Sequence, residues 1–117
     1  MDYPNSIKRR RLVVGNWKMN LDLLKSQSLV TQIVKGVRVN NVSDIVVCPA
    51  YPYLHAVSML LNGSHVMLGA QNVSEYENGA LTGEVSAQML HDFSCRYVII
   101  GHNERRRLQG ESDQRVA

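Results

Sequence analysis

The sequence predicts an α/β fold in which short buried strands alternate with amphipathic helices. Four apolar runs lack the polar alternation of half-exposed strands, which is typical of parallel strands covered on both faces. They occupy residues 12–17, 45–48, 66–70 and 97–100. Apolar residues between the runs repeat at helical spacing, giving the order β-α-β-α-β-α-β and the start of a fourth helix. Such crossovers build either a doubly wound sheet or a (β/α)8 barrel, and the pattern does not choose between them.

The segments between the strands carry signals for where their helices begin. Asn20 is a candidate N-cap for the first helix, and Ser86 for the third. The predicted apolar face of the third helix consists of Met89, Leu90 and Phe93.

Length and composition limit the classes of protein to which this chain can belong. The chain has 117 residues, of which 44% are hydrophobic and 20% charged, as in ordinary globular domains. It has no apolar run of roughly 18 residues and no apolar signal-peptide region, so we expect a cytoplasmic protein without a membrane partner. Cys48 and Cys95 have no CxxC spacing, which predicts buried free thiols and no metal site.

The net charge of +3 comes largely from two basic runs, at residues 8–11 and 105–107. Basic runs can mark nucleic-acid binding. Because no aromatic residues interleave these charges, we expect no nucleic-acid partner. We interpret residues 1–11 as a solvated basic leader and residues 12–117 as the N-terminal half of one α/β domain.

Polar side chains collect where three of the predicted strands end. The pairs are Asn16 and Lys18, Gln71 and Asn72, and His102 and Glu104, after the first, third and fourth runs. The carboxyl ends of parallel strands lie on one face of the fold, where ligands bind. The sequence therefore predicts a ligand site on this face.

His102 follows an apolar strand and precedes a segment in which a helical turn can begin. The partial positive charge of a helix N-terminus disfavours an imidazolium ion there. A neutral imidazole can polarise a carbonyl oxygen while an enediolate forms. The alternative is a structural histidine whose hydrogen bonds are satisfied.

Lys18 lies just past the first strand, beside Trp17. A cation in that place would attract an anionic substrate and stabilise charge that develops on its oxygens. Asn16, on the same side of the chain, would hold either Lys18 or the substrate. An exposed surface lysine is the alternative.

Three strings resemble triosephosphate isomerase, in that family's order and spacing. They are GNWKMN at 15–20, GAQNVSEYENGALTGEVS at 69–86, and GHNERR at 101–106 followed by GESD at 110–113. The resemblance covers residues 12–117. It implies a (β/α)8 barrel of which this chain supplies strands 1–4. It also implies a glycolytic and gluconeogenic enzyme that interconverts dihydroxyacetone phosphate and glyceraldehyde 3-phosphate without cofactor or metal.

The resemblance also implies roles for the residues at the strand ends. Asn16 and Lys18 would contact substrate, Glu104 would pair with Lys18, and His102 would be the neutral electrophile. A histidine kept neutral by a helix N-terminus is a property already described for this enzyme family.

A homodimer is implied as well, through the long loop at residues 73–85. In the family this loop enters the partner subunit, where Thr82 would support the other chain's Asn16 and Lys18. Glu84 would pair with Arg105 across the interface, and Met19 would also lie there.

Two positions depart from the family's pattern. Asn103 stands where serine is nearly always found, and Leu21 stands where glycine is usual. Neither change removes a reacting group, but asparagine is larger than serine and can both donate and accept a hydrogen bond beside His102.

The sequence assigns no residue to the catalytic base, which in the family follows the sixth strand. A complete barrel takes about 250 residues. Half a barrel leaves unpaired strand edges and an uncovered apolar interior, which favour association with another chain or with the missing half. We expect a partial chain that is inactive alone. The alternative is a non-catalytic half-barrel that binds phosphorylated ligands or completes itself with another chain.

Overall fold

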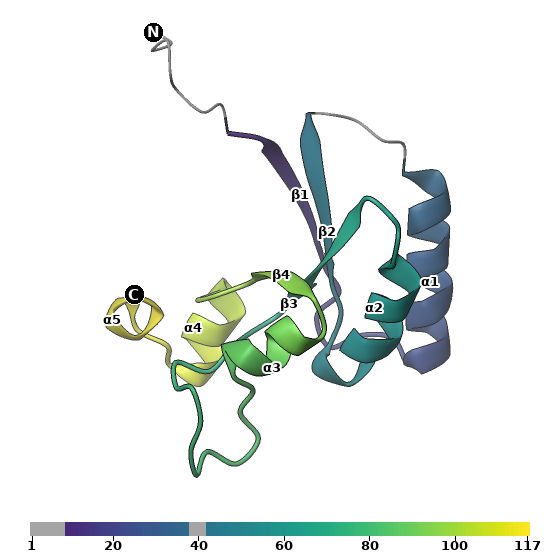
Figure 1. The fold of residues 1–117 in the computed structure, drawn as a ribbon. Helices are drawn as coiled ribbons and strands as arrows, with labels where there is room; N and C mark the ends of the chain where they lie inside the picture. Colours follow the sequence, from purple (N-terminus) through teal and green to yellow (C-terminus); the bar gives the residue numbers. More distant parts are fainter. Residues whose placement is uncertain (1–8, 38–41) are drawn as a thin grey trace, which may run out of the picture.

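The computed structural model describes residues 9–37 and 42–117; most of the predicted leader, residues 1–8, lies outside the described part. Figure 1 shows a twisted sheet with helices packed along one side. Its four parallel strands follow one another in chain order, β1-β2-β3-β4. A doubly wound sheet reverses its strand order at a switch point, whereas a barrel advances in one direction. This order confirms the α/β prediction and agrees with the first half of a (β/α)8 barrel.

The observed strands, whose ends are set by pairing, differ slightly in their bounds from the apolar runs that predicted them. The strands are β1 (Arg11–Asn16), β2 (Ser43–Cys48), β3 (Val66–Ala70) and β4 (Cys95–Val98). Only β3 has the predicted bounds, and β4 begins and ends two residues earlier than predicted. Its pairing with β3 begins at Cys95, opposite Leu68, so the strand includes the exposed Arg96 that interrupts the apolar pattern.

Helix α1 (Leu23–Gly36) begins at a different cap from the predicted Asn20. The side chain of Asp22 accepts a hydrogen bond from the Lys25 N–H at 2.8 Å and is the N-cap. Asn20 instead donates from Nδ2 to the Trp17 carbonyl at 3.1 Å. The carboxylate two residues later therefore caps the helix, and Asn20 stabilises the turn that precedes it.

The remaining helical segments include the predicted second, third and fourth helices, with a 3-10 turn before the second and a further short helix after the fourth. They are the 3-10 turn η1 (Tyr51–Tyr53), α2 (Leu54–Leu61), α3 (Ala87–Asp92), α4 (Asn103–Gln109) and α5 (Asp113–Val116). Ser86 caps α3 as predicted, since its side chain accepts from the Met89 N–H. The predicted apolar face of α3 is wrong in extent: Leu90 is buried, but Met89 and Phe93 are 51% and 38% exposed. Phe93 is the C-cap of α3 and lies beyond its last helical residue, so it is not part of the helix face.

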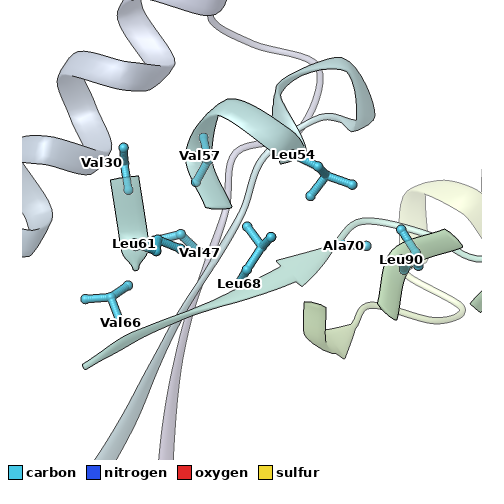
Figure 2. Close-up of a cluster of buried hydrophobic side chains, with 9 residues drawn as sticks. All are labelled: Val30, Val47, Leu54, Val57, Leu61, Val66, Leu68, Ala70 and Leu90. Atoms are coloured by element: carbon cyan, nitrogen blue, oxygen red, sulfur yellow. The ribbon is translucent and has the colours of Figure 1, made fainter. Parts of the chain in front are cut away.

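The core lies between the sheet and the helices on one side of it. Figure 2 shows side chains from α1, α2, α3, β2 and β3 meeting there. The cluster consists of Val30, Val47, Leu54, Val57, Leu61, Val66, Leu68, Ala70 and Leu90. Burying one such large aliphatic side chain contributes roughly 1.5–3 kcal/mol, so this cluster is the main stabilising feature of the fold.

Both cysteines are free thiols, as predicted, but they differ in burial. Cys48 is fully buried and Cys95 only partly. Burial, together with a smaller contribution from nearby Cys95, raises the pKa of Cys48 to about 11. Burial also raises the pKa of Cys95 to about 11. Both sulfurs therefore remain protonated and unreactive near neutral pH.

The strand β1 leaves apolar surface uncovered. Leu12, Val13 and Val14 are 51%, 56% and 42% exposed, and in the described part of the chain β1 pairs only with β2. This confirms the expected open apolar surface. Among the described residues, no helix has the length and apolar character needed to cross a bilayer.

Leu21 adopts a left-handed backbone conformation, with φ of +73°, just before α1. This conformation costs a residue with a Cβ roughly 1 kcal/mol that glycine avoids. We expect Leu21→Gly to raise the free energy of unfolding by up to about 1 kcal/mol. Guanidinium unfolding followed by the fluorescence of Trp17, the only tryptophan, measures this change.

Leu24→Gly is the matched control, because Leu24 has a helical backbone in the first turn of α1 and is 77% exposed. Glycine at a helical position should lower the stability, by up to roughly 1 kcal/mol. Equal losses in the two variants would contradict the interpretation of Leu21 as strained.

Candidate active site

A cavity of about 520 Å³ lies at the carboxyl ends of the strands. The six polar residues predicted at the strand ends all line it: Asn16, Lys18, Gln71, Asn72, His102 and Glu104. They come from the ends of β1 and β3 and from the start of α4, which follows β4. The parallel topology thus brings together residues separated by more than 80 positions in the sequence.

Lys18 and Glu104 form an ion pair at this cavity. The Lys18 Nζ lies 2.5 Å from the Glu104 Oε1, and the two side chains are 50% and 38% exposed. The hydrogen bond from Lys18 lowers the pKa of Glu104, and nearby His102 and Arg107 lower it further. Because water screens so exposed a pair, it contributes little stability. Its main effect is to fix where the ammonium group lies.

His102 is the N-cap of α4, at the place where the sequence predicted a helical turn. Its Nδ1 accepts a hydrogen bond from the Glu104 backbone N–H at 3.1 Å. A nitrogen that accepts carries no hydrogen, so this bond selects the tautomer in which Nε2 is the donor. The side chain is 32% exposed and lines the cavity. It can therefore donate a hydrogen bond to an oxygen bound there.

The position of His102 depends on the preceding Gly101. This glycine has φ of +61°, and a Cβ there would lie 2.6 Å from a side-chain atom of Val116. Arg106 donates from Nε to the Gly101 carbonyl at 2.8 Å and also pairs with Asp113. The turn that presents His102 is thus held by α4 and α5 together.

The backbone of Lys18 is held in a left-handed conformation, with φ of +56°. Asn16 Oδ1 accepts from the Lys18 N–H at 3.0 Å. Gln71 Nε2 donates to the Lys18 carbonyl at 2.8 Å and to the Cys48 carbonyl at 2.9 Å. Sequence reasoning marked Gln71 only as a polar residue at a strand end, and no local signal indicates that it reaches Lys18.

Three of the four residues assigned to a subunit interface are exposed, and the fourth, Arg105, is partly buried. Met19 is 95% exposed, and Thr82 and Glu84 lie on the exposed loop that projects between β3 and α3 in Figure 1. Arg105 is paired within the chain, where its Nε lies 2.8 Å from Oε2 of the nearly buried Glu111. Sequence reasoning missed Glu111, although it stands in the recognised string GESD.

The described residues offer no obvious metal site. Across residues 9–37 and 42–117, no three His, Cys, Asp or Glu side chains come together in a way that could hold a metal ion. The polar groups at the cavity are instead two cations, Lys18 and Arg105, together with one carboxylate, an imidazole, a phenol and amides. This set suits an anionic ligand with carbonyl or hydroxyl oxygens.

The family model and similar curated proteins name the same family. The family model described as triosephosphate isomerase matches residues 11–117. A triosephosphate isomerase of Nitrosomonas europaea is 54% identical over 110 residues, and one of Dechloromonas aromatica is 50% identical over 109. Each alignment covers 93% of this chain but 43% of the relative. The chain thus spans less than half the length of these curated relatives.

Proposed function

Because the chain belongs to the triosephosphate isomerase family, we propose that it supplies part of an active site that interconverts dihydroxyacetone phosphate and glyceraldehyde 3-phosphate. The observation that carries this proposal is the convergence of Lys18, His102 and Glu104 on one cavity. The family's name identifies the substrate as a phosphorylated triose. The reaction would place the protein in glycolysis and gluconeogenesis, and hence in the cytoplasm.

The proposed reaction moves a proton between two adjacent carbons through an enediolate. Negative charge develops on the substrate oxygens during this step and must be stabilised. The Lys18 ammonium group would attract the phosphorylated substrate and stabilise the developing charge. The His102 Nε2–H would donate to the oxygen that carries it. Glu104 would act through Lys18, since it holds the ammonium group in place.

The base that removes the proton is proposed to lie outside the residues described here. Glu104 is the acidic residue at the cavity, and it is already engaged by Lys18. A carboxylate paired with an ammonium ion is a weaker base, because the ion stabilises its charged form. The lowered pKa of Glu104 supports this assignment.

We also propose that the protein works as a homodimer. The exposed loop with Thr82 and Glu84 and the exposed Met19 offer surface for a partner subunit. Arg105, which already donates to Glu111, would donate a further hydrogen bond to a carboxylate on the partner's loop. The names of the relatives do not favour the alternative of a non-catalytic binding module.

A chimera tests the proposed activity. It joins residues 11–117 to the part of the Nitrosomonas europaea relative that lies beyond the match. We expect the chimera to interconvert the two trioses in a coupled assay. The 117-residue chain alone should show no turnover above background, because an electrophile without a base does not enolise a substrate efficiently.

The relative itself serves as the positive control for the assay. A chimera that folds, as judged by circular dichroism, but fails to turn over would argue against the proposed function. Substantial turnover by the 117-residue chain alone would show that the base lies within it and would overturn its assignment elsewhere.

A further inference from the structure

We propose that Gln71 is a positioning residue, which places the Lys18 ammonium group by holding the Lys18 backbone in its left-handed conformation. The inference rests on the proposed function, because Lys18 belongs to that site. Its first test nevertheless measures no activity. Gln71 follows β3, whereas Lys18 follows β1, so this contact joins two strands that are not neighbours in the sheet.

The geometry of the Gln71 amide is specific. Its nitrogen lies 2.8 Å from the Lys18 carbonyl oxygen and 2.9 Å from the Cys48 carbonyl oxygen. Both of its N–H groups are therefore used. Cys48 is the last residue of β2 and is fully buried, so its carbonyl is a fixed point. Through its two hydrogen bonds, the amide therefore links the turn containing Lys18 to the buried end of β2.

The Lys18 backbone needs such support because its conformation is costly. A residue with a Cβ loses roughly 1–2 kcal/mol in the left-handed region. Asn16 binds the Lys18 N–H, and Gln71 binds its carbonyl. Without Gln71, this carbonyl loses the bond that fixes its direction, and φ can relax to a negative value. That rotation would redirect the Cα–Cβ bond and carry Nζ away from Glu104.

Few other side chains could do the same. Methionine has nearly the same length but no donor, and asparagine is one methylene too short to bind both carbonyls. Lysine would bring a second positive charge beside the first. Glutamine gives two donors without a net charge, so it adds no charge to those of Lys18, Glu104 and Arg105 at the cavity.

The pKa of Glu104 reports where Lys18 lies. It is lowered chiefly by the hydrogen bond from Lys18, with His102 and Arg107 contributing in the same direction and desolvation opposing them. We expect Gln71→Met to raise it toward the ordinary value. NMR titration of the Glu104 side-chain carboxyl in the full chain measures this shift. An unchanged pKa in a folded Gln71→Met chain would overturn the proposal.

Gln32→Met is the matched control. Gln32 is exposed on α1, and its Nε2 donates to Ser28 Oγ at 3.4 Å, so the Glu104 pKa should not change. Should Gln71→Met fail to fold, Gln71→Asn keeps the amide but cannot span both carbonyls. The same rise in the Glu104 pKa is then expected, and its absence again overturns the proposal.

A double-mutant cycle in the active chimera gives a second test. Gln71→Met should lower kcat/KM about tenfold, since a misplacement of about 1 Å can cost up to roughly 10²-fold. In a Lys18→Ala background the same change should cost less than about twofold, because Gln71 acts through the Lys18 side chain. Equal losses in both backgrounds would indicate a merely structural role. If the chimera itself is inactive, the proposed function fails, and the Glu104 titration still decides the role of Gln71.

Discussion

Replacing His102 by glutamine in the chimera should lower kcat by about 10²–10³-fold, the usual cost of losing one donor to a developing oxyanion. KM should change little. The hydrogen bond from Nε2 strengthens as negative charge builds on the substrate oxygen, so its loss affects the chemical step more than binding. Glutamine can still accept from the Glu104 N–H, as His102 Nδ1 does at 3.1 Å, which favours a preserved N-terminus of α4. Steady-state kinetics in both directions measures kcat and KM.

His65→Gln provides the control for this substitution. His65 is exposed and precedes β3, at the opposite end of the strands from the cavity. Its replacement should leave both constants within about twofold, as expected for a surface change. If His102→Gln instead raises KM and leaves kcat intact, His102 is a binding or structural residue, and the proposed mechanism is wrong.

The parts of the fold that could be predicted are those set by local sequence. Continuous apolar runs place the four strands, and β3 has its predicted bounds because apolar residues fill it from end to end. Ser86 caps α3 because a hydroxyl before a helix binds a free N–H three residues on. The polar residues at strand ends share one cavity because parallel strands end on one face.

The features of the fold and site that could not be predicted depend on contacts between residues distant in the sequence. The start of β4 is set by pairing with β3, which includes the charged Arg96 in the strand. Asn20 and Asp22 are both good caps, and the turn through Leu21 decides that Asp22 is used. The two bonds of Gln71 join residues 53 and 23 positions apart, so no local pattern predicts them.

The lowered pKa of Glu104 also makes the stability of the fold depend on pH. A carboxyl with a lower pKa in the folded than in the unfolded state stabilises the fold above its unfolded pKa, and this contribution is lost as the pH falls through the folded value. Lys18 is the main cause of the shift. Lys18→Ala should therefore reduce the dependence of the unfolding midpoint on pH in the acid range below the ordinary value of 4.5.

The same Lys18→Ala change should lower kcat/KM of the chimera by about 10²-fold or more, as expected for losing a charged group that stabilises the transition state. Unlike His102→Gln, it should raise KM as well as lower kcat. An ammonium group beside an anionic substrate stabilises both the bound substrate and the more charged transition state. Nζ lies 2.5 Å from Glu104, so the substitution also leaves that carboxylate without its partner, facing the incoming phosphate.

The double variant Lys18→Ala, Glu104→Gln separates these two effects. Removing the unpaired negative charge should recover part of the lost affinity, seen as a lower KM than in Lys18→Ala, while kcat stays low. Lys25→Ala is the control, because Lys25 is 73% exposed and its Nζ lies at the limiting distance of 4.0 Å from Asp22. A loss in Lys18→Ala confined to KM and fully reversed by Glu104→Gln would mean that Lys18 only neutralises Glu104. In that case the stabilisation of the enediolate would fall to His102 and to groups outside these residues.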